Sequence, residues 1–208
     1  MATAVVLVIL TVREGRLSVL LIERAAEPFR GEWALPGGFL LPGESLDGAA
    51  SRKLANETGV SDLFLEQLYT FDGSGDGRAE VVVTYFALVD ALRARLRSDL
   101  EWRPAWHAIE RLPGLAFGND RIISYAVRRL RNKLQYANVA YSLLPDRFTM
   151  SELQGVYQAI LGETIDKRNF RRRIEGLDIV RPTGQWKKTG AHRPAMLYEF
   201  TTREPLSF

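Results

Sequence analysis

One short stretch combines an acidic side chain with two residues that do not suit a metal site. In SRKLANETGV, Asn56 and Glu57 follow Lys53 by three and four positions, so on an α-helix they share one face with it. Magnesium prefers hard oxygen ligands, commonly carboxylates together with substrate phosphates. Lys53 places a positive charge on that face instead and can pair with Glu57. The three positions share a helix face, and their residue types predict weak metal binding.

The surrounding sequence resembles the Nudix hydrolase signature, Gx5Ex7REUxEExGU, in which U is aliphatic. From Gly38 the chain reads GFLLPGESLDGAASRKLANETGV, and the register holds across all 23 positions. The matching positions are Gly38, Glu44, Arg52, Leu54, Glu57, Gly59 and Val60. Lys53 and Asn56 stand where the family has Glu. WALPGG precedes the signature, as in many Nudix proteins.

The resemblance implies a chemistry that this chain has partly lost. Nudix enzymes cleave a diphosphate linked to another moiety, using Mg²⁺ held by glutamates on this helix. With two of those positions changed, we expect no enzymatic function, no catalytic residue and no cofactor or metal. Glu44 and Glu57 are the candidates for any residual, magnesium-dependent hydrolysis. Lys53 and the amides of Gly37 and Gly38 can still favour a diphosphate without a metal.

Length and composition set broad limits. The 208 residues suit two domains, because typical domains have about 100 to 150 residues. The absence of cysteine excludes disulfides, thiolate nucleophiles and sulfur-ligated zinc, and it suits a cytoplasmic location. The apolar opening MATAVVLVILTV is too short for a membrane span, which needs about 20 residues, and lacks the basic flank of a signal peptide. We expect no association with a membrane.

Charge is distributed unevenly along the chain. Residues 1–146 carry 17 Lys and Arg against 18 Asp and Glu, whereas residues 147–208 carry 11 against 7. The whole positive excess therefore lies in the last third of the chain. This asymmetry indicates two functions, one of which faces a polyanion.

Periodicity predicts both strands and helices in the first 145 residues. We expect a strand in MATAVVLVILTV and a second over 17–24 that form a hairpin, a loop at EPFRGEWALPGG, and a helix over 45–59 that Ser45 caps and Gly59 ends. LFLEQLYTF and EVVVTYFALV are strand-like, and DLEWRPAWHAIERLPGLAF predicts a short strand followed by turns. A long helix over 120–144, with Asn119 or Asp120 as its cap, is expected to end at Pro145. We place the domain boundary there, giving domains of 1–145 and 146–208.

The last third predicts two helices and a strand pair. Helices are expected over 149–161 and 166–175, followed by a strand, a basic loop and a strand that ends at Phe200. Thr149 and Glu152 have the spacing of a capping box. Phe170 and Ile174 mark the buried face of the second helix, and at about 100° per residue Arg168, Asn169 and Arg172 point away from it. Such a helix suits the major groove of DNA, where Arg and Asn can read base edges.

The candidate DNA-binding residues follow from this arrangement. They are Lys167, Arg168, Asn169, Arg171, Arg172 and Arg173 on the helix, and Lys187, Lys188 and Arg193 on the basic loop, which would form a wing. We expect Trp186 to be partly buried and His107 and His192 to be structural, because their spacing fits no metal site. A further basic group, Arg128, Arg129, Arg131 and Lys133, is interpreted as a solvated helix face, although a groove edge could also use it.

The two halves together resemble the Nudix-related transcriptional regulators of NAD metabolism. The resemblance includes EPFRGEWALPGGF, FTMSELQGVYQAILG, DKRNFRR and RPAMLYEF, and it covers nearly the whole chain. It implies a Nudix α/β/α sandwich with a mixed sheet, followed by a small winged helix-turn-helix domain. It also implies a homodimer that binds a palindromic operator, represses NAD biosynthesis genes, and releases the DNA when ADP-ribose or a related nucleotide binds the Nudix pocket.

The resemblance further implies a set of ligand-binding residues. These are Arg24, Gly37, Gly38, Arg52, Lys53, Glu57 and Arg78 near the diphosphate, with Phe29 or Trp33 stacking on a base. The segment DGSGDGRAEVVVTYF, which holds Arg78, departs from the usual family pattern, so the identity of the ligand stays open.

Three alternatives remain open on the sequence. The protein could be an active Mg²⁺-dependent ADP-ribose or nucleotide-sugar pyrophosphatase whose tail only mediates oligomerisation. It could instead be a Nudix regulator of sugar catabolism that senses a sugar metabolite, or an RNA-binding hydrolase. Under the favoured hypothesis, the ligand selects one arrangement of the dimer and the helix over 120–144 transmits it to the recognition helices.

Overall fold

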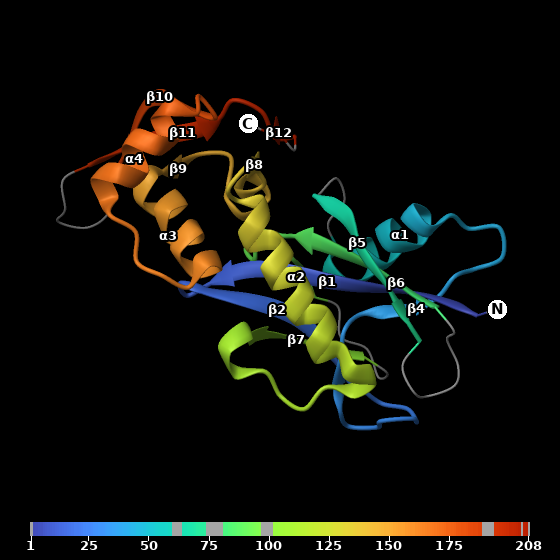
Figure 1. The fold of residues 1–208 in the computed structure, drawn as a ribbon. Helices are drawn as coiled ribbons and strands as arrows, with labels where there is room; N and C mark the ends of the chain where they lie inside the picture. The colour runs from blue at the N-terminus through green and yellow to red at the C-terminus, as the bar shows by residue number, and fades with distance from the viewer. Residues whose placement is uncertain are drawn as a thin grey trace.

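The computed structural model describes residues 2–59, 64–73, 81–96, 102–188, 194–204 and 206–207. A mixed sheet forms the centre of the N-terminal part (Figure 1). Among the described residues it contains seven strands: β1 (Thr3–Arg13), β2 (Arg16–Arg24), β3 (Trp33–Ala34), β4 (Gly37–Phe39), β5 (Leu65–Asp72), β6 (Val81–Leu88) and β7 (Trp102–Ala108).

Strand β1 organises this sheet. It pairs antiparallel with β2 through its C-terminal half, antiparallel with β4 through its N-terminal half, and parallel with β6 along its other edge. Strand β5 follows β6 at one end of the sheet, while β3 and β7 pair with β2. The expected hairpin is confirmed. The short strands β3 and β4 lie in a segment expected to be loop, because their pairing with β2 and β1 is a long-range contact that local sequence does not encode.

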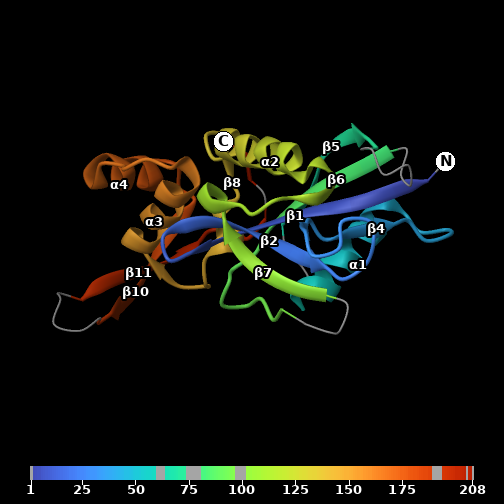
Figure 2. The same ribbon diagram turned by 90° about the horizontal axis from the view of Figure 1, so that it is seen from below.

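The sheet has a helix on each face, as the Nudix sandwich requires (Figure 2). Side chains of β1 alternate between the faces. Val5, Leu7 and Ile9 pack with helix α1 (Leu46–Thr58), and Val8 and Leu10 pack with helix α2 (Asn119–Lys133). Because β1 is covered on both faces, its run of apolar residues is nearly continuous.

The ends of α1 follow the sequence signals. The Ser45 hydroxyl accepts a hydrogen bond from the Gly48 amide, and Gly59 ends the helix in the left-handed conformation with φ of 67°. A Cβ at Gly48 would lie 3.0 Å from the Ser45 hydroxyl oxygen. The glycine inside the helix therefore leaves space for the capping side chain.

Helix α2 differs from its prediction at both ends. It begins after Gly118, whose left-handed backbone provides no side-chain cap. It ends at Lys133 and is followed by strand β8 (Ala137–Asn138) and the 3-10 turn η3 (Ala140–Leu143). The expected helix over 120–144 is therefore wrong beyond residue 133. Every residue from 137 to 144 is buried, so packing on all sides overrides the local helical pattern.

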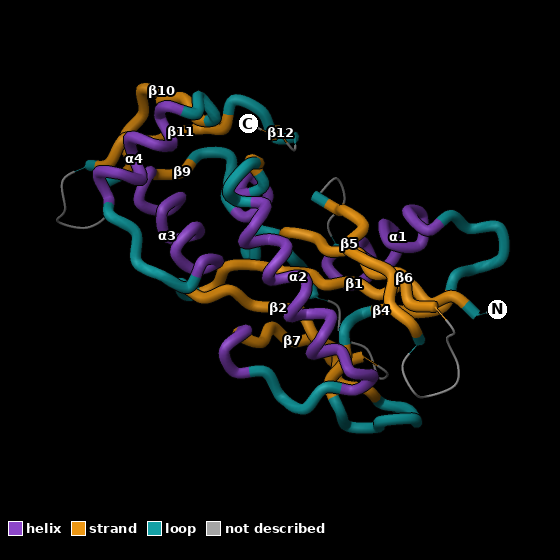
Figure 3. Tube along the Cα trace, viewed as in Figure 1, coloured by secondary structure: helices purple, strands orange, loops and turns teal. Residues whose placement is uncertain are grey.

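The C-terminal part is a winged helix (Figure 3). It contains strand β9 (Phe148–Thr149), helices α3 (Met150–Leu161) and α4 (Lys167–Gly176), and strands β10 (Val180–Lys187) and β11 (Ala195–Phe200). The three strands form a sheet in the order β10-β11-β9. The capping box of Thr149 and Glu152 at α3 is confirmed, and Asp166 caps α4.

The two parts share one hydrophobic core. A single cluster of buried side chains runs from the sheet through α2 to α3, α4 and the wing strands, and includes Leu130, Leu153 and Phe200. At the last turn of α2, Arg131 Nε donates to the Ile160 carbonyl of α3 over 2.8 Å. A short strand β12 (Leu206–Ser207) pairs with β8 beside this junction. The winged helix is therefore packed against the sheet domain, in addition to being connected to it through the chain.

Candidate functional site

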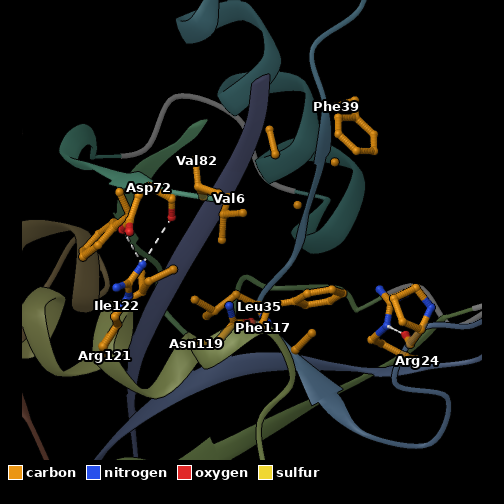
Figure 4. Close-up of a pocket in the computed structure, with 16 residues that line it drawn as sticks. Val6, Arg24, Leu35, Phe39, Asp72, Val82, Phe117, Asn119, Arg121 and Ile122 are labelled. Atoms are coloured by element: carbon orange, nitrogen blue, oxygen red, sulfur yellow. Dashed lines mark hydrogen bonds and ion pairs between the residues drawn. The ribbon is translucent and has the colours of Figure 1, made fainter. Parts of the chain in front are cut away.

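A cavity of about 190 Å³ opens beside the N-terminal half of β1 (Figure 4). Its size exceeds several-fold the roughly 30 Å³ that one water occupies in the liquid, so it can hold part of a small molecule. The lining residues are Ala4, Val6, Arg24, Pro28, Ala34, Leu35, Gly37, Gly38, Phe39, Phe71, Asp72, Val82, Phe117, Asn119, Arg121 and Ile122. Most are apolar or aromatic, with a few polar groups that could orient a ligand.

Arg24 provides one positive charge, at the end of β2. Its Nε donates to the Pro28 carbonyl over 2.9 Å, and its guanidinium carbon lies 4.7 Å from the centre of the Phe117 ring. Phe117 in turn meets Phe29 edge-on, with ring centroids 4.8 Å apart. These contacts tie Arg24 to the loop that follows β2.

Arg121 provides a second positive charge, from the first turn of α2. Its Nη2 lies 2.9 Å from Asp72 Oδ1 and 3.2 Å from the Asp72 carbonyl, at the end of β5. Its guanidinium carbon lies 5.2 Å from the centre of the Phe71 ring. Figure 4 shows the Arg121–Asp72 pair at one side of the cavity and Arg24 at the other.

A turn before α2 places the start of this helix beside the cavity. Phe117 has a positive φ of 58°, a conformation that non-glycine residues rarely adopt, and Gly118 follows with φ of 63°. Asn119, expected as a possible helix cap, instead accepts a hydrogen bond from the Leu35 amide through Oδ1 at 2.7 Å. This bond joins the start of α2 to the segment between β3 and β4, so α2 forms one wall of the cavity.

The glycine pair Gly37 and Gly38, at the start of the signature, lies where backbone and side chains approach closely. A Cβ at Gly37 would lie 2.9 Å from both the Val5 carbonyl oxygen and Val6 Cγ2. A Cβ at Gly38 would lie 3.1 Å from Lys53 Nζ. The ammonium of Lys53 therefore lies next to strand β4, which lines the cavity.

The signature residues Glu44 and Arg52 form a bidentate ion pair. Arg52 Nε and Nη2 donate to the two carboxylate oxygens of Glu44 over 2.6 and 2.7 Å. Hydrogen bonding from Arg52 lowers the pKa of Glu44 below its ordinary value, and the Leu41 amide adds to this effect. This pair ties the loop before α1 to the helix itself.

The side chains do not fit a magnesium site. No group of three or more His, Asp or Glu side chains in the described part of the chain is placed to hold a metal ion. On α1, the positions expected to share one face carry Lys53, Asn56 and a single carboxylate, Glu57. A cation and an amide are poor partners for Mg²⁺.

The predicted ligand residues are distributed over several places. Arg24, Gly37 and Gly38 line the cavity. Phe29 contacts the lining residue Phe117, whereas Trp33 meets His107 edge-on at 4.4 Å and packs against the core. Arg52, Lys53 and Glu57 lie on α1, outside the lining set. Arg78 lies outside the described residues, as do Arg193 and His192.

Sequence reasoning missed the lining residues Phe39, Phe71, Asp72, Phe117, Asn119 and Arg121. No local signal marked them. Asn119 was interpreted as a possible helix cap, and the structure instead places it, with Arg121, in the first turn of α2. The other four come from separate strands and turns, so only the fold brings the six together.

A second candidate site lies on α4. Phe170 and Ile174 are buried, as expected, while Arg168, Asn169 and Arg172 are exposed on the opposite side. Arg172 Nη2 donates to Asn169 Oδ1 over 3.2 Å. These three side chains are therefore available on one surface of the helix.

Two other arginines of α4 contact the rest of the protein. Arg171 pairs with Glu175 at 2.9 Å and donates to the Tyr198 hydroxyl at 2.8 Å. Arg173 Nη2 lies 3.5 Å from the Gln135 carbonyl, just beyond α2. Both are exposed, so they can position α4 and still lie near a bound partner.

The wing is formed by β10 and β11. Lys187 and Lys188 are exposed at its end, and Lys187 pairs with Glu152 of α3 at 2.6 Å. Trp186 is 58% exposed, so the expected partial burial is wrong. Residues 184–188 of the chain are all exposed, and Met196 is the cross-strand partner of Trp186.

The basic group on α2 is not simply a solvated face. Arg129 and Lys133 both pair with Glu66 of β5, and the Lys133 side chain is only 11% exposed. Arg131 reaches α3, and only Arg128 has neither of these roles, lying over the Tyr125 ring. Arg129, Arg131 and Lys133 therefore fasten α2 to its neighbours.

None of the described helices is long and apolar enough to cross a membrane.

Comparison with known proteins matches both parts of the chain. The NUDIX domain family matches residues 1–126, and the NrtR DNA-binding winged helix domain matches residues 140–200. The ADPR responsive transcriptional repressor NtrR of Acinetobacter baylyi is 37% identical over 202 residues, which cover 94% of this chain and 80% of that protein.

Solved structures agree with this match. The crystal structure of Shewanella oneidensis NrtR complexed with a 27mer DNA is 36% identical and has a TM-score of 0.83, covering 96% of this chain and 93% of that one. The NUDIX domain of the same Shewanella protein complexed with ADP ribose is 35% identical with a TM-score of 0.54, covering 62% and 87%. With a NUDIX domain followed by an NrtR winged helix, the chain belongs to the NrtR family of Nudix-related transcriptional regulators.

Proposed function

We propose that this protein is a DNA-binding transcriptional repressor of NAD biosynthesis genes that releases its operator when ADP-ribose or a related nucleotide occupies the cavity. The observation that carries the proposal is helix α2. Its first turn lines the cavity, and its last turn is bonded to the helix-turn-helix. A ligand pocket and a basic helix on one continuous core are the parts that a ligand-controlled regulator needs.

The contact with DNA is assigned to α4 and the wing. Arg168, Asn169 and Arg172 would enter the major groove, because they are exposed and lie opposite the buried face of α4. The remaining contacts, mostly to phosphates, are assigned to Lys167, Arg171, Arg173, Lys187, Lys188 and Arg193. The relative solved with a 27mer DNA supports this assignment.

A homodimer reading a palindromic operator is part of the proposal. A two-fold symmetric protein presents two copies of α4 to two half-sites about 34 Å apart, one turn of DNA. We place the boundary between the effector domain, 1–145, and the DNA-binding domain, 146–208, near Pro145. We also propose a cytoplasmic location, because a regulator of chromosomal genes must be in the same compartment as the DNA.

The effector is assigned to the cavity between α2 and strand β4. ADP-ribose bound to the NUDIX domain of a relative supports this choice, as does a repressor relative described as ADPR responsive. Arg24 and Arg121 supply positive charge for a diphosphate, and Phe39, Phe71 and Phe117 supply apolar surface for a base or sugar. Because a ligand shifts an equilibrium only through its differential affinity, it must bind the released state more tightly than the DNA-bound state.

We propose that the protein is not an enzyme. Lys53 and Asn56 replace two acidic positions of the signature, and the nearby carboxylate of Glu44 is already paired with Arg52. The alternative is a residual Mg²⁺-dependent pyrophosphatase that uses Glu44 and Glu57. Turnover of ADP-ribose in the presence of Mg²⁺ or Mn²⁺, abolished by Glu57→Gln, would support that alternative.

The main test is operator binding with and without the effector. A duplex from the promoter region of the gene itself is labelled, and its binding to the full chain is followed by fluorescence anisotropy. ADP-ribose is expected to weaken binding about 5- to 150-fold, since allosteric coupling is typically about 1–3 kcal/mol. Unchanged operator affinity at saturating ADP-ribose would contradict the proposed effector. Release by a sugar metabolite instead would favour the sugar-catabolism alternative.

Variants of α4 separate DNA binding from the other functions. Arg168→Ala and Arg172→Ala should each weaken operator binding by about 1–3 kcal/mol, as expected for a side chain that contacts a base. Arg13→Ala, an exposed residue at the β1–β2 turn, is the matched control and should leave binding unchanged. Preference for single-stranded RNA over the palindromic duplex would instead support an RNA-binding protein.

A further inference from the structure

We infer that Arg121 is an anion anchor of the cavity, and that a phosphate of the ligand takes the place of Asp72 as its partner. The inference rests on the proposed function, because it concerns the same cavity. It adds a binding residue outside the Nudix signature, on α2 instead of α1. It also identifies the bond that is exchanged when the ligand binds.

Arg121 is placed where a ligand can reach it. It lines the cavity, and its side chain is 47% exposed. Its ring partner Phe71 also lines the cavity, so the guanidinium lies over an aromatic surface on the wall. The planar guanidinium can bind a phosphate through two parallel hydrogen bonds, a geometry that ammonium groups do not offer.

The bond between Arg121 and Asp72 is easily exchanged. The Asp72 side chain is 85% exposed, and water can solvate its carboxylate after the bond breaks. Exposed ion pairs of this kind contribute little to stability. A phosphate of the ligand offers Arg121 more acceptor oxygens than Asp72 does, inside a cavity whose other walls are largely apolar. Replacement of Asp72 by the ligand is therefore favourable.

Arg24 is a different kind of residue, although it lines the same cavity. Its donors reach the carbonyl oxygens of Pro28, at 2.9 Å, and Ala26, at 3.4 Å, within its own loop. A carbonyl is neutral, so these bonds orient Arg24 without neutralising it. Arg121, by contrast, faces a carboxylate. The charge available to a ligand therefore rises when Asp72 leaves Arg121.

The position of Arg121 on α2 links this exchange to the DNA-binding part. Arg121 lies in the first turn of α2, and Arg131, in the last turn, holds the carbonyl of Ile160 in α3. Between them the buried side chains of α2 belong to the cluster that continues into the winged helix. When Arg121 binds the ligand, a displacement of the first turn of α2 toward the cavity is transmitted along the rigid helix to the contacts of its last turn.

The test measures ADP-ribose binding to the full-length protein by calorimetry. Arg121→Gln is expected to weaken ADP-ribose binding at least about tenfold, as for loss of a charge-assisted hydrogen bond. Arg121→Lys should recover only part of this loss, because an ammonium lacks the planar fork. Arg128→Gln is the matched control on the same helix. Arg128 lies over Tyr125 outside the cavity lining, so its change should leave affinity unaltered.

The exchange itself is tested by removing the competing carboxylate. Asp72→Asn should tighten ADP-ribose binding by about two- to fivefold, which is the range expected for an exposed ion pair. Adenosine, which carries no phosphate, should bind wild type, Arg121→Gln and Asp72→Asn equally. Unchanged or weaker ADP-ribose binding by Asp72→Asn would overturn the exchange.

The outcomes separate this inference from the proposed function. If wild-type protein binds ADP-ribose and Arg121→Gln binds it with the same affinity, the role of Arg121 is wrong and the effector assignment stands. If wild-type protein binds no ADP-ribose at all, the proposed effector itself is wrong. Equal weakening of adenosine and ADP-ribose by Arg121→Gln would show a structural effect of the substitution, and would also overturn the anchor role.

Discussion

Helices α1 and α2 cover opposite faces of one sheet, and they contribute to the protein in different ways. Helix α1 carries the recognisable signature, yet its buried residues Ala49, Ala50 and Leu54 belong to a cluster confined to the sheet domain. Helix α2 carries no signature, but it lines the cavity and its buried residues join a cluster that extends to Phe200. The helix that identifies the family is thus distinct from the helix that connects its two parts.

The difference has a physical basis in what each helix touches. The polar residues of α1 with described partners bond within the sheet domain: Arg52 pairs with Glu44 in the preceding loop, and Asp47 accepts a hydrogen bond from the Tyr85 hydroxyl of β6. Those of α2 reach distant segments: Asn119 bonds to Leu35, Arg129 and Lys133 pair with Glu66, and Arg131 bonds to Ile160. Loss of acidic residues from α1 therefore need not affect the connection between cavity and DNA-binding surface.

The strongest test of this comparison is the removal of one buried leucine from each helix. Leu130→Ala in α2 and Leu54→Ala in α1 should each lower the free energy of unfolding by about 2–5 kcal/mol, because both leave a cavity in a packed core. Only Leu130→Ala is expected to weaken operator binding under conditions where both variants remain folded. The measurements are urea denaturation and fluorescence anisotropy. Equal weakening by both variants would remove the distinction between the helices.

A second test restores the acidic positions of α1. The double substitution Lys53→Glu and Asn56→Glu should raise Mn²⁺ affinity at least about tenfold, because two carboxylates replace a cation and an amide on the helix face that also carries Glu57. The control is Lys53→Gln with Asn56→Gln, which removes the positive charge without adding negatively charged ligands. Binding is measured by calorimetry or by the electron spin resonance of free Mn²⁺. Unchanged affinity in the double Glu variant would refute this view of α1.

A third test weakens the contact between the last turn of α2 and the winged helix. Arg131→Gln removes the 2.8 Å bond to Ile160, and it should reduce the effect of ADP-ribose on operator affinity by several-fold, corresponding to about 1 kcal/mol. Binding of ADP-ribose in the absence of DNA should be unchanged, because Arg131 lies outside the cavity lining. Arg128→Gln again serves as the control on the same helix. If ADP-ribose weakens operator binding by Arg131→Gln as much as by wild type, the coupling between cavity and DNA-binding surface does not depend on this bond.

The smallest expected effect concerns the pair of Glu44 and Arg52. Arg52 lowers the pKa of Glu44 in the folded protein, so the pair stabilises the fold above the unfolded-state pKa of about 4.3. This contribution is lost as the pH falls through the lowered pKa of the folded state. The difference in melting temperature between wild type and Glu44→Gln should therefore be largest near neutral pH and shrink below about pH 4.3. Glu32→Gln, an exposed position, should show no such dependence.

Local signals in the sequence determined the helix ends and helix faces that depend only on neighbouring residues. Ser45 and Gly59 set the ends of α1, and Thr149 with Glu152 set the start of α3, since a cap bonds to backbone only a few positions away. The buried pair Phe170 and Ile174 likewise determined which side of α4 is exposed. The signature and the basic tail were sufficient to identify the family, and the periodicity of α4 defined the surface that we propose faces DNA.

Tertiary structure alone decided where α2 ends and what forms the cavity. The segment after Lys133 has helical periodicity, but its residues 137–144 are all buried, and strand β8 pairs with β12, which lies about seventy residues farther along. The cavity draws Arg24, Phe71, Asp72 and Arg121 from separate elements, so no short window of sequence contains it. Caps and periodicity act over a few residues, whereas a pocket depends on which distant strands and helices pack together.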